Sequence, residues 1–135
     1  MDKKIADNIY ILVCDDVRHE VGNKVSIMGI YDDIVLRETP AILPKINLAI
    51  LLKGFKRNIS KVQVKLKCPD GNDIDMPEMT IPPNKKTGSN YNLDICVAPL
   101  KVIEPGKFVW EIRFDGEKKP TIKHEMDILT VNMKK

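Results

Sequence analysis

The sequence predicts an all-β protein, an antiparallel β-sandwich of seven or eight strands that is immunoglobulin-like or C2-like in type. Apolar and polar residues alternate with a period of two in most apolar segments, as they do in strands with one buried face. Turn-forming residues separate these segments about every ten residues, a spacing typical of sandwiches and barrels. A length of 135 residues suits one domain with one core. Residues 1–135 are therefore expected to form a single sandwich domain.

The N-terminal segment is predicted to form a hairpin in which Ile9 to Glu20 pairs with Val25 to Leu36. Gly22-Asn23 lies between these strands and has the composition of a two-residue turn. With that turn, Cys14 faces Tyr31 across the ladder. This register is a hypothesis that rests on the length of the turn alone.

Helical alternatives compete with two of the predicted strands. Asp16 could cap one helical turn over Val17 to Val21, and the sequence does not exclude it. Ile46 to Leu52 could also be helical, but Pro44 before it and Gly54 after it limit that helix to about two turns. A strand is therefore favoured there. Because both of its sides are largely apolar, both faces are expected to be covered.

The remaining strands follow from alternation and from the turn residues at their ends. They are expected over Val62 to Cys68, Tyr91 to Val97 and Phe108 to Phe114. A last strand over Ile128 to Met133 follows a polar stretch from Glu117 to Glu125. The core is expected to close around the inward positions of these strands and of the strand before them, namely Ile46, Leu48, Val64, Leu66, Leu93, Ile95, Trp110 and Ile112.

The segment from Asp70 to Asn90 is predicted to be a long loop. It contains Pro77, Pro82 and Pro83, followed by a polar run. Proline removes a backbone donor and is rare inside strands. The segment is too short to link two domains.

Composition predicts a cytoplasmic protein that does not enter a membrane. No tract reaches the ~18 apolar residues that a spanning helix needs, and the N-terminal residues lack the apolar region of a secretory signal. Cys14, Cys68 and Cys96 are widely spaced and odd in number, which is typical of reduced thiols rather than of a disulfide framework.

A resemblance to a known family extends over nearly the whole chain. The motifs that carry it are Leu12 to Asp16, Gly22 to Lys24, Ile27 to Tyr31, Leu43-Pro44, Cys68 to Gly71, Pro105 to Phe108 and Phe114 to Glu117. In their order and spacing, the chain resembles a family of small bacterial proteins that is known only as a domain of unknown function. The resemblance implies a β-sandwich and no particular activity. Asp16-Val17-Arg18 is more charged than the family pattern.

A cysteine nucleophile is not expected. Cys14 and His19 are the nearest pair, but an offset of five residues places them on opposite faces of a strand and about 16 Å apart. On a helix the same offset puts them roughly 140° apart. The geometry allows His124 to pair with a cysteine, but no nearby residue in the sequence indicates such a pair. The thiols are therefore interpreted as buried structural residues.

No metal or other cofactor is expected. Zinc sites need closely spaced pairs of thiolates or imidazoles, and the sequence contains none. In the register assumed above, Asp15 and Asp32 share a face as diagonal neighbours roughly 7 to 8 Å apart. Two carboxylates at that separation make a weak cation site. They are favoured instead as charged residues at solvated strand ends, or as partners of Arg18.

The basic middle of the chain is the strongest functional hint. Seven basic and no acidic residues lie between Thr39 and Pro69. Six of these are candidate anion-binding residues: Lys53, Lys56, Arg57, Lys61, Lys65 and Lys67. On one face they would attract phosphates or an acidic protein. Exposed lysines also prevent edge-to-edge aggregation, and Phe55 is the only aromatic residue nearby for stacking a base. The protective role is favoured over nucleic-acid binding.

Taken together, the sequence favours a non-enzymatic binding or interaction module that recognises a protein partner through a sheet edge or loops. The reason is that strand and helix geometry brings no candidate acid, base, nucleophile or metal ligand into contact with a suitable partner. Electrostatic binding of an anionic ligand or nucleic acid by the lysine-rich face is the second hypothesis. An unrecognised hydrolase is the third. The sequence leaves homo-oligomer formation open and does not identify the partner.

Overall fold

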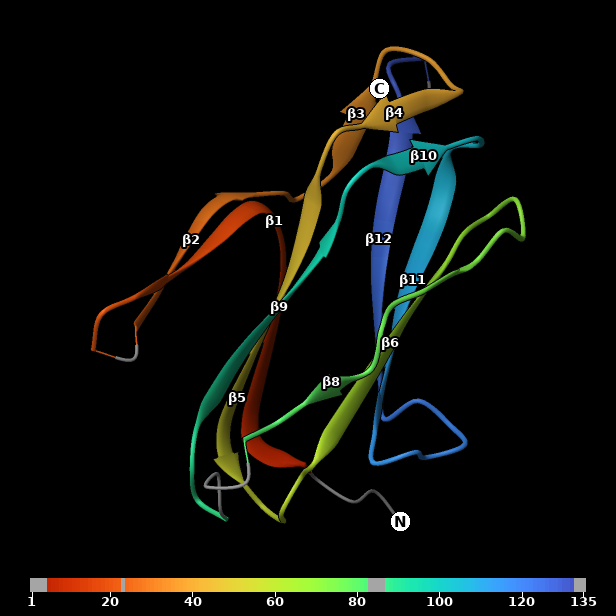
Figure 1. Cartoon of the computed structure of the whole chain (residues 1–135). Helices are drawn as coiled ribbons and strands as arrows, with labels where there is room; N and C mark the ends of the chain where they lie inside the picture. The colour runs from red at the N-terminus through yellow and green to blue at the C-terminus, as the bar shows by residue number, and fades with distance from the viewer. Residues whose placement is uncertain (1–4, 23, 83–86, 133–135) are drawn as a thin grey trace.

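The structure is a computed structural model of the whole chain, and residues 5–22, 24–82 and 87–132 are described (Figure 1). The described residues form twelve strands and no helix, which confirms the all-β class. In chain order the strands are β1 (Ala6–Glu20), β2 (Lys24–Ile30), β3 (Ile34–Leu36), β4 (Ala41–Leu43), β5 (Ile46–Phe55), β6 (Lys61–Lys67), β7 (Ile74–Asp75), β8 (Met79–Thr80), β9 (Tyr91–Val97), β10 (Leu100–Val102), β11 (Gly106–Phe114) and β12 (Ile122–Thr130). Over these residues, no helix is long and apolar enough to span a membrane.

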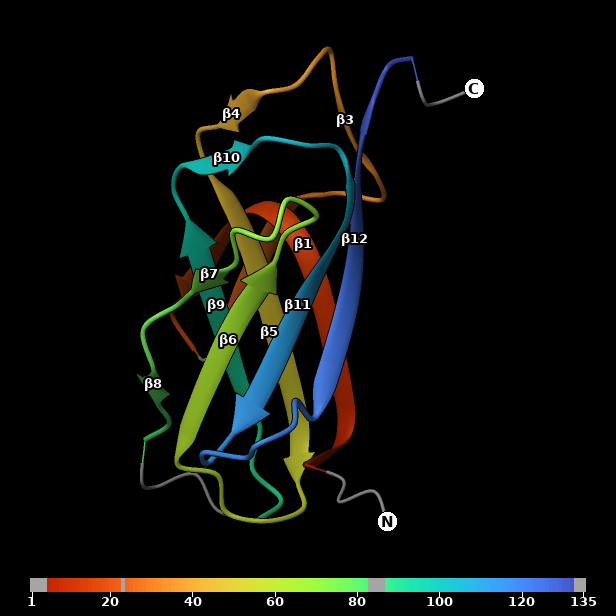
Figure 2. The same cartoon turned by 90° about the vertical axis from the view of Figure 1, so that its right-hand side faces the viewer.

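Two principal sheets pack face to face (Figure 2). One has the order β2-β1-β5-β9, and the other has the order β3-β12-β11-β6-β7, with β8 also paired to β6. A two-stranded sheet, β10-β4, lies at one end. The pairs are antiparallel except for β12 and β3, which run parallel. The immunoglobulin-like or C2-like type of the sandwich stays a prediction.

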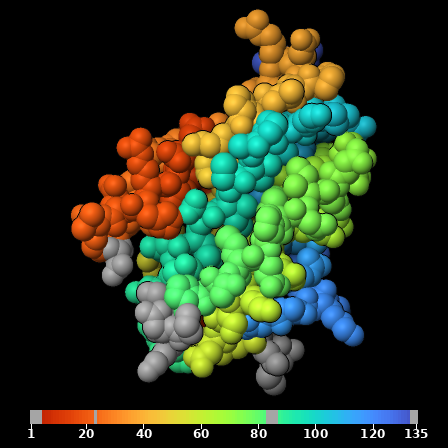
Figure 3. Space-filling view, viewed as in Figure 1, coloured from red at the N-terminus to blue at the C-terminus, as the bar shows by residue number. Residues whose placement is uncertain are grey.

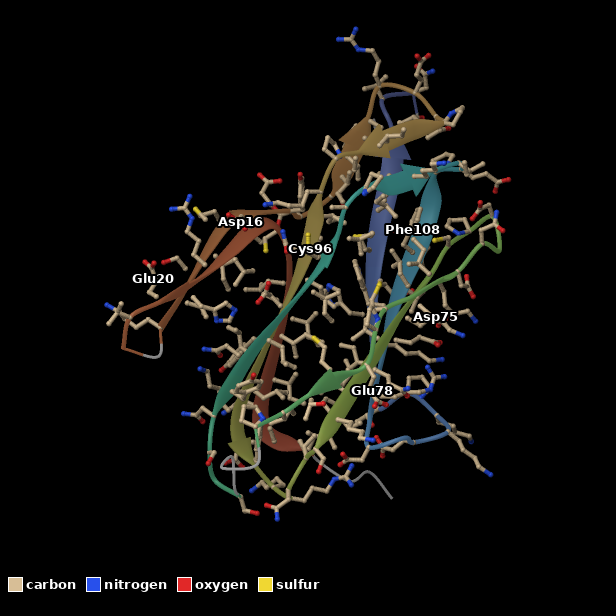
Figure 4. The ribbon with its side chains drawn as sticks, in the orientation of Figure 1. Asp16, Glu20, Asp75, Glu78, Cys96 and Phe108 are labelled. Carbon is tan, nitrogen blue, oxygen red and sulfur yellow. The ribbon has the colours of Figure 1, made fainter. Side chains whose placement is uncertain are left out.

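The core fills the space between the sheets, as the alternation predicts. All eight predicted core residues are buried, and Trp110 has no exposed surface. Phe108 also projects between the sheets (Figure 4). Burial of an aromatic side chain of this size contributes about 1.5–3 kcal/mol to stability.

The register predicted for the first hairpin is wrong by one residue. Glu20 faces Lys24 and Cys14 faces Ile30, so the connection spans residues 21–23, the last of which lies outside the described residues. Gly22 has φ +89°, a conformation that glycine adopts without strain and that suits a three-residue loop. The alternative helical turn over Val17 to Val21 is also wrong, because β1 is extended to Glu20.

The strand predicted over Val25 to Leu36 is divided between the two sheets. It breaks after Ile30 and resumes at Ile34 as β3 beside β12. The chain therefore crosses from one sheet to the other here, which an uninterrupted apolar pattern does not reveal.

Two further predictions on element boundaries need correction. The last strand begins at Ile122, because Lys123, Glu125 and Asp127 are the outward positions of β12 rather than a polar loop. The predicted loop from Asp70 to Asn90 contains β7 and β8, which pair with β6. Strands of two residues are too short to show periodicity. Residues 83–86 of that segment lie outside the described residues.

Both faces of β5 are covered, as its sequence predicts. Leu48 and Ile50 face the core, while Asn47 and Ala49 on the opposite side are 3% and 0% exposed. The hairpin of β1 and β2 lies on this side of the sheet, since its residues Asp15 and His19 contact Asn47 and Asp94.

Candidate functional site

The hairpin formed by the second half of β1 and by β2 projects from the body of the molecule (Figure 1). Residues 6–14 of β1 pair with β5, and residues 14–20 pair with β2. Cys14 is the one position recorded in both ladders. β1 therefore leaves the sheet at Cys14 and continues as one arm of the hairpin.

Asp15 fixes the base of the hairpin. Its backbone carbonyl accepts a hydrogen bond of 2.7 Å from Nδ2 of Asn47, which is buried on β5. Its carboxylate accepts a hydrogen bond of 2.6 Å from the hydroxyl of Tyr31. Gly29 has φ +66°, and a Cβ at this position would overlap the Asp15 carboxylate. The bend therefore requires a residue without a side chain at position 29.

The far end of the hairpin is held by a contact between a histidine and a carboxylate. Nε2 of His19 lies 2.5 Å from Oδ1 of Asp94, on the outer side of β9. Lys45, just before β5, contacts Asp16 at 3.3 Å in the same region, and this contact is the main reason that the pKa of Asp16 is lowered. The hairpin is consequently attached to the outer side of β5 and β9 through Asn47, Asp94 and Lys45.

A cleft remains between the hairpin and the sheet, with a volume of about 370 Å³. We call it the hairpin cleft. The hairpin contributes His19, Glu20, Lys24 and Val25, and the end of the sheet contributes Lys53, Asn90, Tyr91 and Asn92. Figure 3 shows the hairpin, in red and orange, beside β9, in teal, and Figure 4 shows Glu20 on the hairpin arm.

The outer edge of β2 has no strand beside it among the described residues. Antiparallel pairs alternate between hydrogen-bonded and non-hydrogen-bonded positions, but the ladder lacks the pair Asp15–Gly29, so the alternation shifts at the bend. The N–H of Val17 donates to the side chain of its neighbour Asp16, which makes Val17 and Ile27 a non-hydrogen-bonded pair. Ser26 and Met28 therefore turn their N–H groups toward β1, while Val25 and Ile27 turn theirs outward. β2 offers a row of main-chain donors and acceptors to the exterior.

The six candidate anion-binding residues do not form one free positive face. Four of them contact acidic side chains from other parts of the chain: Lys56 with Asp7 at 2.5 Å, Arg57 with Glu117 at 3.4 Å, Lys61 with Glu78 at 3.6 Å and Lys65 with Asp75 at 3.8 Å. Figure 4 shows Asp75 and Glu78 on the segment that runs beside β6. Lys53 lies in the hairpin cleft. Lys67 forms no ion pair within the described part of the chain.

A second depression, which we call the outer groove, crosses the exposed side of β6, β11 and β12. It has a volume of about 510 Å³ and is lined by Lys67, Cys68, Lys107, Val109, Glu111, Lys123 and Glu125. Lys107 lies 3.3 Å from Glu125 and 3.8 Å from Asp127. The hydrogen bond to Glu125 is the main cause of the raised pKa of Lys107. Charges of both signs therefore alternate along this face.

Cys14 and Cys68 lack the surroundings of a nucleophile. Burial raises the pKa of the Cys14 thiol, and it raises the pKa of Cys68 to about 11. Both shifts disfavour the reactive thiolate. His19 pairs with Asp94 rather than with Cys14. His124 lies opposite Trp110 in the ladder, and burial lowers its pKa.

Asp15, one of the two carboxylates considered for a cation, is engaged in another contact. Among the described residues, no group of three or more His, Cys, Asp or Glu side chains could hold a metal. Asp15 accepts the Tyr31 hydroxyl. The shift of the register by one residue also removes the diagonal relation between Asp15 and Asp32 on which that hypothesis depended.

Sequence reasoning did not identify the hairpin cleft. His19 and its partner Asp94 are 75 positions apart, and the lining residues of the cleft come from β1, β2, β5 and β9 and the residue before β9. The local signal is the charged stretch Asp16-Val17-Arg18 that follows the apolar run from Ile9 to Cys14, because it marks where β1 leaves the sheet.

Comparisons with known proteins identify the family of the chain but do not identify an activity. The model of a family of unknown function, DUF6941, matches residues 9–125 of the chain. No curated protein matches it significantly. Among solved structures, the chain is similar to the Pseudomonas fluorescens alkylpurine DNA glycosylase AlkC, bound to DNA containing an abasic site analog, with 16% sequence identity and a TM-score of 0.42. The alignment covers 71% of this chain and 27% of that chain, so the chain spans a small part of that protein's length. A likeness this weak carries no argument about function.

Proposed function

We propose that this chain, which belongs to the family of unknown function DUF6941, is a non-enzymatic module that binds a protein partner through the edge of β2. In this proposal an extended segment of the partner adds to the sheet beside β2, so that main-chain hydrogen bonds supply much of the affinity. The observation that carries it is the outward row of main-chain groups on β2, at the side of a projecting hairpin.

The composition of β2 supports strand addition. Natural proteins protect edge strands with charge, proline or short length. Residues 25–29 contain no charge and no proline, and β2 spans seven residues. By contrast, the outermost strands of the other principal sheet, β3 and β7, span three and two residues. β2 is therefore long enough and neutral enough to accept a partner.

Exposed apolar side chains near both ends of β2 favour a protein as the ligand. Val21 is 95% exposed and Ile30 is 54% exposed. Contact with a partner would remove these side chains from water, which contributes about 25 cal/mol per Å² of apolar surface. The raised pKa values of Cys14 and Cys68 support a role without covalent catalysis.

Electrostatic binding of an anionic ligand by the lysine-rich face is a second candidate. One observation favours it: Lys67 and Lys123 line the outer groove, and neither forms an ion pair with another described residue. Because four of the six predicted anion-binding residues already contact carboxylates, we rank this function below strand addition.

We also propose a cytoplasmic location. Cys14, Cys68 and Cys96 are all free thiols, and Cys96 is exposed. Exposed free thiols persist in reducing compartments and are rare in secreted proteins.

Two substitutions at Ile27 test the β2 proposal. Ile27→Pro removes an outward N–H but leaves the ladder to β1, because that ladder uses the N–H groups of the neighbouring residues. Ile27→Ala is the matched control, since it also shortens the side chain but keeps the N–H. A partner captured from native extract by the wild-type chain is expected to bind Ile27→Ala and to lose at least about tenfold in affinity for Ile27→Pro relative to Ile27→Ala. Equal binding to both variants would reject the β2 edge as the contact.

A further inference from the structure

We infer that the hairpin cleft binds a small anionic ligand, a molecule with a carboxylate or phosphate group that Lys24 and Lys53 hold from opposite walls. This inference does not rest on the β2 proposal, because the cleft and the outer edge of β2 are different surfaces of the hairpin.

The charges around the cleft support an anion. Lys45, Lys56, Lys61 and Lys65 each lie within 4 Å of a carboxylate. Lys24 and Lys53, in the described part of the structure, have no such partner. Nζ of Lys53 donates to an amide oxygen, Oδ1 of Asn92, at 3.4 Å. Two cations without a counter-charge therefore meet at one cleft, where a ligand carboxylate or phosphate would form charge-assisted hydrogen bonds.

One acidic residue, Glu20, also lines the cleft. It faces Lys24 across the ladder but is not within ion-pair distance of it. Its carboxylate accepts a hydrogen bond of 3.2 Å from the Ser26 hydroxyl. Asp94 is paired with His19. The two positive charges of Lys24 and Lys53 thus exceed the one negative charge of Glu20, which favours an anionic over a cationic ligand.

The amide side chains are oriented to assist. The N–H of Gly54 donates to Oδ1 of Asn90 at 2.9 Å, and Lys53 donates to Oδ1 of Asn92. Because both amide oxygens are engaged, the hydrogen-bonding groups that remain on these two side chains are their NH₂ donors. The cleft therefore presents cations and donors together, which suits acceptor oxygens.

The size of the cleft sets the size of the ligand. A volume of about 370 Å³ falls at the lower end of the roughly 300–1,000 Å³ that small-molecule sites occupy. Tyr91 and Val25 give it an apolar side. The ligand is accordingly a small molecule with one anionic group and a short apolar body.

Isothermal titration calorimetry with inorganic phosphate and with glutarate, at low and constant ionic strength, tests the inference. Saturable binding of phosphate, glutarate or both is expected, and which of them binds assigns the anionic group. Lys24→Met and Lys53→Met, which keep the side-chain length, should each weaken that binding about tenfold or more.

Lys56→Met is the matched control, because Lys56 is three residues from Lys53 but already contacts Asp7. It should leave the affinity within about twofold of wild type. Unfolding curves of all three variants should coincide with the wild-type curve, since the substituted lysines are at the surface. Absence of saturable binding of both probes, or an equal loss in Lys56→Met, would overturn the inference.

Discussion

Gly29 is the residue on which the position of the hairpin depends most directly. It combines a positive φ of +66° with close approach of the Asp15 carboxylate. Any side chain introduced at position 29 would therefore strain the backbone and overlap the Asp15 carboxylate. Gly29→Ala is expected to lower the free energy of unfolding by about 1–3 kcal/mol, the cost typical of such strain plus local displacement. Urea unfolding monitored by Trp110 fluorescence measures it.

Gly71→Ala provides the control for that substitution. Gly71 has φ +85°, but a Cβ there would meet nothing within 4 Å. Gly71→Ala should therefore lower the free energy of unfolding only by the cost of the backbone strain, about 1 kcal/mol. A loss for Gly29→Ala no larger than that for Gly71→Ala would show that the Asp15 contact does not constrain the hairpin.

Tyr31 makes stability depend on pH in alkaline solution. Its hydrogen bond to Asp15, followed by burial, raises its pKa from 10.0 to about 12. The neutral phenol is thus favoured in the folded state, so its contribution is complete below pH 10 and is lost as the pH rises through 12. Tyr31→Phe should be less stable than wild type at pH 8, and the difference should shrink at pH 11. A difference that is constant over this range would contradict the Asp15 contact.

At the scale of elements, local sequence predicts a strand well when turn-forming residues mark both of its ends. Phe108 to Phe114 alternates strictly and is bounded by Pro105-Gly106 and Asp115-Gly116, and β11 is found there. The register of the first hairpin was wrong because glycine at position 22 suits a two-residue or a three-residue loop. The start of β12 was missed because its exposed side is highly charged.

The site was less predictable than the strands for a physical reason. Charge runs are visible in sequence, but their neutralisation depends on residues brought close by folding. Lys61 and Lys65 contact Glu78 and Asp75 only because β7 and β8 pair with β6. The contact between His19 and Asp94 likewise requires the hairpin to fold over the sheet.

The contact between His19 and Asp94 predicts the mobility of the hairpin. His19 and Asp94 have side chains 55% and 29% exposed, and exposed ion pairs contribute about 0–1 kcal/mol. Asp94→Asn is therefore expected to speed hydrogen exchange of β2 amides by a few-fold while leaving global stability nearly unchanged. Asp75→Asn, which removes a contact on the other sheet, should leave β2 exchange unaltered. Unchanged β2 exchange in Asp94→Asn would mean that the pair does not hold the hairpin.

At the scale of the whole molecule, charge argues against strong binding of polyanions. The formal net charge is +3, and most of the basic middle segment is paired with carboxylates. The chain is expected to leave a heparin column below about 0.15 M salt, where screening already exceeds weak surface attraction. Retention to several times that concentration would favour the lysine-rich face over the β2 edge.

The architecture as a whole places one long, neutral edge strand on a projecting hairpin, and partner binding there is the central proposal. Hydrogen exchange of the chain with and without its captured partner measures it most directly, because the amides of Val25 and Ile27 turn away from β1 and no other described strand lies beside them. Strand addition predicts that these two amides slow by at least about tenfold in the complex. Unchanged exchange at Val25 and Ile27, with protection elsewhere on the surface, would contradict it.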